Sequence, residues 1–137
     1  MVCPRISILH YSAPPVVGGV EAVILAHAQI FVQAGYPVTV VAGKGEAEAL
    51  PEGADLVLVP EIDSLNAEIT RMGTQMEQGQ VPPGFEAMSE RLGSALAPIL
   101  SSFDNLIVHN VFTKHFNLPL TVALDRLLDG DRAPHCI

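Results

Sequence analysis

The chain has 137 residues, a length that fits one domain. Its formal net charge of -8 argues against a broad nucleic-acid-binding surface, which needs clustered lysine and arginine. Apolar residues make up 49% of the chain and charged residues 16%, which excludes disorder, and no apolar run approaches the roughly 18 residues of a membrane span. This surplus of apolar over charged residues predicts a sheet buried on both faces, or a partner surface that this chain lacks.

The ends of the chain suggest a compartment and a boundary. The apolar run that starts at Ile6 is too short for a signal peptide and is broken by His10, so we expect a cytoplasmic protein. Cys3 and Cys136 lack C-x-x-C spacing, which favours buried thiols over a zinc site, a redox motif or a disulfide. The pattern predicts that a strand begins at Pro134, so residues 1–137 are expected to form one domain of a longer protein.

The elements in chain order alternate between strands and helices. Short apolar or β-branched runs predict strands at 6–10, 38–42, 56–59 and 105–109, and another from residue 134. Apolar residues at helical spacing predict helices at 20–34, 65–78, 85–101 and 114–128, with Ser64 as the cap of the second. This order predicts an α/β, Rossmann-like fold: an open, mostly parallel sheet with helices on both faces.

Two loops lie where such a sheet binds ligands, beyond the carboxyl ends of its strands. One runs from His10 to Gly19 and the other from His109 to Lys114. Gly18 and Gly19 open the first predicted helix, where free backbone N–H groups and the helix dipole favour a phosphate. A tight turn without a ligand is an equal alternative. The loop lacks G-x-G-x-x-G, and the segment 43–45 lacks the spacing of a P-loop, so neither nucleotide fingerprint is present.

The histidines are the main candidates for acid–base chemistry. His10 and His109 end predicted strands at the expected crevice, where a neutral imidazole can position or deprotonate a hydroxyl. A structural role for each is the alternative. His27 lies on the apolar stripe of the first helix and is expected in the core, while no partner is evident for His115 or His135.

Three stretches together resemble a known family. These are Pro14 to Glu21 with its glycine pair, the run 31–40 that ends in Val-Thr-Val, and the strand Ile107-Val108-His109 followed by Asn110. In this order they resemble the amino-terminal half of glycosyltransferase family four, retaining enzymes of the GT-B fold that use nucleotide sugars. Tyr36-Pro37 departs from the usual Gly-His pattern.

The resemblance implies a transferase whose amino-terminal half binds the acceptor, while a missing carboxy-terminal domain holds most of the donor. It places the donor diphosphate at Gly18 and Gly19 and assigns His109 a catalytic position near the transferred sugar. Acceptor contacts are expected from His10 and from three residues of the later loop, Asn110, Thr113 and Lys114. The implied partners are a nucleotide sugar, a sugar or lipid acceptor and the missing domain, with no nucleic acid, no metal and no other cofactor. Peripheral contact with a membrane stays open.

Two other functions stay open. One is a different GT-B enzyme, such as a nucleotide-sugar epimerase. The other is a non-catalytic, Rossmann-like binding module. A longer reading frame with a second βαβ domain and a glutamate motif would favour the transferase. The 137-residue chain by itself is expected to be inactive as a transferase. The sequence names neither the sugar nor the acceptor.

Overall fold

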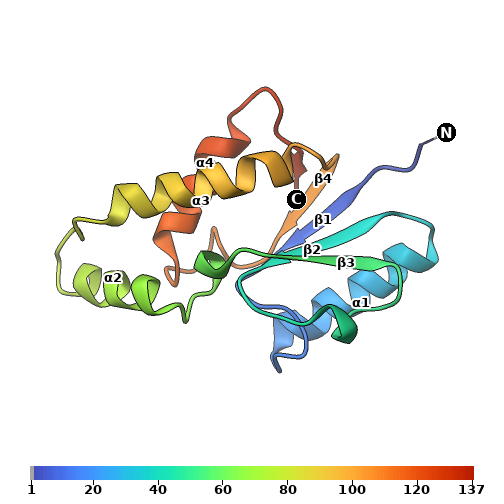
Figure 1. Cartoon of the computed structure of the whole chain (residues 1–137), viewed down its shortest axis with the longest axis horizontal. Helices are drawn as coiled ribbons and strands as arrows, with labels where there is room; N and C mark the ends of the chain where they lie inside the picture. The colour runs from blue at the N-terminus through green and yellow to red at the C-terminus, as the bar shows by residue number, and fades with distance from the viewer. Residues whose placement is uncertain (1) are drawn as a thin grey trace.

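A computed structural model describes residues 2–137 as an α/β fold built on one parallel sheet (Figure 1). Its strands are β1 (Ile6–Leu9), β2 (Val38–Ala42), β3 (Ala54–Leu58), β4 (Asn105–Val108) and β5 (His135–Cys136). Its helices are α1 (Gly19–Gln33), α2 (Ala67–Glu77), α3 (Phe85–Leu100) and α4 (Leu118–Leu128), with short 3-10 turns η1 (Ala47–Ala49) and η2 (Pro60–Ile62). The strand order is β3-β2-β1-β4-β5, which confirms the predicted Rossmann-like class.

The first βαβ unit follows directly from local sequence. The β-branched run of β2 suits a buried parallel strand, and β2 pairs with β1 from Ile6 opposite Val38 onward. Helix α1 between them ends at Gln33 with Ala34 as its C-cap, and the next residue, Gly35, takes a positive φ of 86° that other residues rarely adopt. This glycine lets the chain leave the helix and enter β2 within a few residues.

The sheet separates two apolar cores. On one face α1 packs Ile24 and Ala28 against Ile8 of β1 and Val40 of β2. On the other face α2, α3 and α4 pack against Leu9, Val41 and Leu106, and Figure 1 shows α1 lying across the sheet from α3 and α4. Side chains of a strand alternate between faces, so neighbouring residues such as Ile8 and Leu9 enter different cores. The sheet is therefore buried on both faces, as the composition predicts.

Several boundaries and two cysteines differ from prediction. Ser64 does not cap α2; the side chain of Asn66 does, accepting from the N–H groups of Glu68 and Ile69. Helix α4 begins at Leu118, later than the predicted residue 114, because Asn117 caps it and a proline follows within its first turn. Cys3 and Cys136 are exposed free thiols, so the expectation of buried thiols is wrong.

The reversal of strand order creates the position at which this fold binds ligands. From β1 the chain builds outward through β2 and β3, and it then crosses to the other side of β1 to add β4 and β5. The carboxyl ends of β1 and β4 therefore flank the topological switch point, where doubly wound sheets leave a crevice. The next residues along the chain are His10 after β1 and His109 after β4.

Candidate functional site

Backbone pairing places His10 and His109 side by side. Leu9 of β1 lies opposite Val108 of β4, and the N–H of His109 donates to the carbonyl of Leu9 at 3.0 Å. The N–H of His10 donates to the carbonyl of Val41 at 3.2 Å, which continues the ladder toward β2. The two imidazole rings lie 6.4 Å apart between centroids, nearly perpendicular. The structure thus brings together the two histidines that the sequence analysis placed at this crevice.

Hydrogen bonding defines the tautomer of His10. Its Nδ1 lies 3.2 Å from the backbone carbonyl of His109, and a carbonyl only accepts, so Nδ1 carries the proton. In the neutral ring Nε2 is then an acceptor, and it faces Oε1 of Glu21 at 3.7 Å. Burial lowers the pKa of His10, opposed by the His109 carbonyl and by the charge of Glu21. His10 is 5% exposed and therefore lies beneath the surface. There it connects the loop after β1 to the loop after β4 through the His109 carbonyl.

Glu21 and Ser12 belong to the same cluster, and the sequence analysis did not select them. Ser12 Oγ donates to Oε1 of Glu21 at 2.5 Å, and Glu21 is only 8% exposed. In the sequence, Glu21 only ends the stretch from Pro14 that carries the family resemblance. The available signal was an acidic residue in the first turn of a helix, where the dipole favours negative charge. That signal also fits ordinary surface carboxylates, and only the fold shows that this one is buried beside His10.

The two glycines at the start of α1 have different surroundings. The N–H groups of Gly19 and Val20 donate to no acceptor within residues 2–137, as expected for a first helical turn. A Cβ added to Gly18 would lie 2.2 Å from Oε2 of Glu21, whereas one added to Gly19 would meet nothing within 4 Å. Gly18 has an extended φ of -172°. The expected diphosphate position therefore combines free amides with a neighbouring carboxylate.

His109 faces α1 across the crevice. It is half-buried, and its ring lies 6.3 Å from that of His27 on α1. Within the described chain, His109 Nε2 and His27 Nδ1 are buried nitrogens without a hydrogen-bond partner. Burial lowers the pKa of His109, and the nearby His10 and His27 lower it further. His27 itself is half-buried at the edge of the α1 core rather than enclosed by it.

The loop after β4 is tightly turned. Asn110 takes a positive φ of 65°, which asparagine tolerates better than most residues. Its carbonyl accepts the N–H groups of Thr113 and Lys114 at 3.0 and 2.8 Å, and the Thr113 hydroxyl also donates to it. The side chains of Thr113 and Lys114 are exposed. Their place near the histidine cluster follows only from the position of this loop after β4.

A shallow groove of about 340 Å³ opens beside Glu21. The loop that follows β1 and the start of α1 line the groove, and η1 contributes Ala49. Its lining is aliphatic except for Glu21, with Pro14, Val16, Val17 and Leu25 as the larger contributors. The groove thus leads from an apolar surface to the buried carboxylate.

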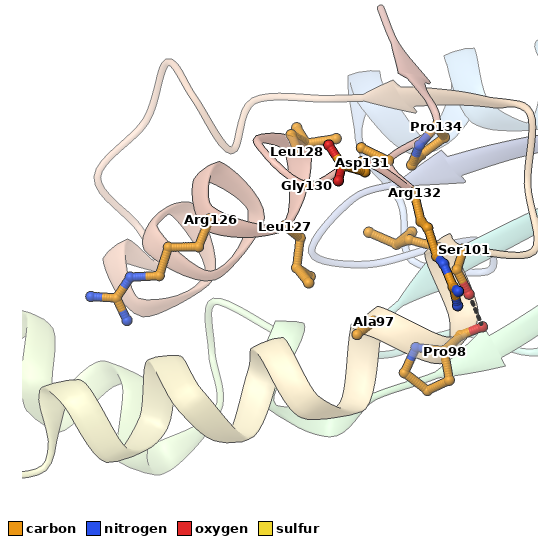
Figure 2. A pocket seen from close by; sticks show the side chains of 12 residues that line it. Ala97, Pro98, Ser101, Arg126, Leu127, Leu128, Gly130, Asp131, Arg132 and Pro134 are labelled. Atoms are coloured by element: carbon orange, nitrogen blue, oxygen red, sulfur yellow. Dashed lines mark hydrogen bonds between the residues drawn. The ribbon is translucent and has the colours of Figure 1, made fainter.

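A second hollow of about 450 Å³ lies at the opposite end of the sheet, where strands begin (Figure 2). It is formed by the end of α3 and the connection from α4 to β5, and Figure 2 shows the Arg132 side chain extending toward Ser101 and Pro98. The Ser101 hydroxyl donates to the carbonyl of Pro98 at 3.2 Å. This hollow is remote from both histidines. Residues 2–137 hold no group of three or more histidine, cysteine or acidic residues arranged to bind a metal.

Across residues 2–137, no helix is long and apolar enough to cross a membrane. The assignment of the chain to glycosyltransferase family four stays a prediction from the sequence. No protein-family model, no curated protein and no solved structure matches this chain.

Proposed function

We propose that this chain is the acceptor-side half of a glycosyltransferase that moves a sugar from a nucleotide-sugar donor to a hydroxyl acceptor. The observation that carries the proposal is the cluster at the topological switch point. There His10, His109 and the free amides of α1 converge from three separate segments of the chain. A Rossmann-like sheet binds its ligands at this position. The family resemblance of the sequence supports the same function.

The chemistry of glycosyl transfer suits these groups. Breaking the bond to a nucleoside diphosphate develops negative charge on the leaving group, and free N–H groups at a helix start stabilise such charge. In this proposal the amides of Gly19 and Val20 receive the diphosphate, with Gly19 allowing close approach. Because the carboxylate of Glu21 lies against Gly18, the phosphates approach from the Gly19 side of the turn.

His109 is the residue proposed to lie nearest the reacting centre. Its buried Nε2 has no hydrogen-bond partner among residues 2–137, and its lowered pKa keeps the ring neutral near pH 7. A neutral imidazole can accept a hydrogen bond from a sugar or acceptor hydroxyl. Asn110, Thr113 and Lys114 follow His109 in the loop and are proposed as outer acceptor contacts.

The test compares two histidine variants in the protein that joins this chain to its carboxy-terminal domain. A panel of nucleotide sugars is assayed for transfer or hydrolysis. We expect His109→Ala to lower kcat by about 10²- to 10⁴-fold, the range for a positioned acid–base group. His115→Ala is the matched control, because His115 is exposed and its ring contacts only that of Phe116 among the aromatic side chains.

Two results would contradict the proposal. One is the absence of turnover with every nucleotide sugar. The other is a kcat for His109→Ala within a few-fold of the parent, combined with a sharply lower melting temperature. The second result would make His109 a packing residue and leave the crevice without its proposed catalytic group.

A further inference from the structure

The aliphatic groove beside α1 includes one carboxylate, that of Glu21, and only one of its two oxygens accepts a hydrogen bond from residues 2–137. Oε1 of Glu21 accepts from Ser12 and faces His10 Nε2. Oε2 points toward Gly18, a lining residue of the groove, and accepts no hydrogen bond from residues 2–137. Glu21 is only 8% exposed, and it lines the groove together with Gly18. The groove therefore has an apolar body and a polar end.

The polar end of the groove offers an acceptor. Oε2 of Glu21 accepts, and Glu21 lies in the first turn of α1, at the positive end of the helix dipole. A carboxylate ligand would be repelled by Glu21, and an ammonium ligand would face the positive end of the α1 dipole and its free N–H groups. A hydroxyl donates to Glu21 and carries no charge of its own, so it meets neither repulsion.

The walls of the groove determine the rest of the ligand. The walls present hydrocarbon from Pro14, Val16, Val17, Leu25 and Ala49, and Val17 is 99% exposed. Covering such surface with an aliphatic chain gains about 25 cal/mol for each Å² removed from water. A sugar hydroxyl cluster would find only one charged partner along these walls, so a polar body is disfavoured.

We propose that this groove binds an aliphatic alcohol, with the hydroxyl held by Glu21 and the hydrocarbon chain lying along the wall formed by the loop after β1. The inference rests on the proposed function for one point only, that the bound alcohol is the acceptor. Glu21 is then the residue that selects a hydroxyl, and the groove selects an amphiphilic acceptor over a free sugar.

Three probes with the same hydrocarbon chain test the groove in the 137-residue protein: n-hexanol, hexylammonium and hexanoate. Amide chemical shifts are followed during titration, and the reporters are Gly18, Ala22 and Leu25, which line the groove. We expect saturable shifts with n-hexanol. Hexanoate should bind at least about tenfold more weakly, because it loses a charge-assisted hydrogen bond and meets Glu21. Hexylammonium should lie between them.

Two variants separate the groove from general apolar binding. Glu21→Gln removes the charge while keeping the shape, and it should bring the hexanoate affinity close to that of n-hexanol. Ala49→Leu places a larger side chain at the end of the groove and should abolish the n-hexanol shifts. Ile30→Ser is the matched control, since Ile30 is a 59% exposed residue of α1 outside the groove, and it should leave all three affinities unchanged.

The inference is overturned if hexanoate binds as well as n-hexanol, if the shifts fall outside the groove, or if no probe binds. Failure of the proposed function is a different result. In that case n-hexanol binds as described, yet the protein joined to its carboxy-terminal domain transfers no sugar to any alcohol. Conversely, transfer to free sugars without n-hexanol binding would overturn the groove assignment and leave the transferase intact.

Discussion

Gly18 and Gly19 are neighbours in the sequence, yet the structure predicts opposite effects of adding a side chain. A Cβ on Gly18 would collide with the Glu21 carboxylate, which is buried and held by Ser12. A Cβ on Gly19 meets no atom within 4 Å, and neither glycine has a positive φ. Gly18→Ala should displace Glu21 and lower the free energy of unfolding by about 1 kcal/mol or more. Gly19→Ala should raise it by about 0.5 kcal/mol, because alanine restricts the unfolded chain.

Urea unfolding at neutral pH measures both changes in free energy. The two variants control for one another, since each adds the same methyl group to the start of α1. Equal effects would mean that the Glu21 carboxylate moves away without cost. A loss of stability in Gly19→Ala would mean that its surroundings are closed.

The buried histidines predict how stability depends on pH. Burial lowers the pKa of both His10 and His109 below the ordinary value of 6.5. As pH falls below about 6.5, the unfolded chain takes up these protons before the folded one does, so the free energy of unfolding decreases. Their contribution is fully present above pH 6.5 and is lost as pH approaches the lowered values. Urea midpoints measured between pH 7.5 and about 5 should therefore decline.

Single-histidine variants assign this dependence to the cluster. His109→Gln should flatten the decline, because glutamine does not titrate. His115→Gln should leave it unchanged, since His115 is exposed. If both variants keep the slope of the parent protein, the pH dependence comes from other groups.

Among the elements, α4 depends on one polar side chain at its start. Asn117 is 1% exposed, and its Oδ1 accepts the N–H of Leu120 at 3.1 Å. Its Nδ2 donates to the carbonyls of Glu61 and Ile62 at 2.8 and 3.1 Å. Asn117 therefore joins η2 to α4, two segments that lie far apart in the sequence.

Asn117→Ala removes this cap and leaves two carbonyls without their donor. We expect the free energy of unfolding to fall by about 2 to 4 kcal/mol, from a lost cap and unsatisfied buried carbonyls. Denaturant titration measures the change. Asn66→Ala is the comparison, because Asn66 caps α2 at a half-buried position and should cost about 1 kcal/mol. Equal costs would mean that the bonds to η2 contribute little.

At the scale of the whole molecule, residues 2–137 supply one side of the proposed binding crevice. The switch point is lined by the loops after β1 and β4 and by the start of α1, and the proposed donor-binding half lies outside these residues. On the proposed function, the donor-binding half supplies contacts that orient donor and acceptor, so the purified 137-residue chain should consume no nucleotide sugar. Chromatography of the nucleotide products measures consumption. Turnover by this chain alone would show that its single crevice suffices.

Local sequence determined most of the fold. Apolar and β-branched runs located all five strands, and helical spacing located the four helices, because these patterns reflect burial on one or two faces. The boundaries that differed depend on caps. Ser64 and Asn66 are both plausible caps in sequence, and only the geometry of the turn decides that Asn66 reaches the free N–H groups. The exposed state of Cys3 and Cys136 likewise depends on how the last strand lies at the edge of the sheet.

The candidate site shows the same division. The sequence by itself placed His10 and His109 after strands and placed Gly18 and Gly19 at a helix start, because strand ends and helix starts can be located from local patterns. Only the tertiary structure decided that β1 and β4 are neighbours, which brings the two histidines together. It also decided that Glu21 folds back over Gly18 to meet Ser12 and His10. The physical reason is that strand order and side-chain burial arise from contacts between distant segments, which no local pattern encodes.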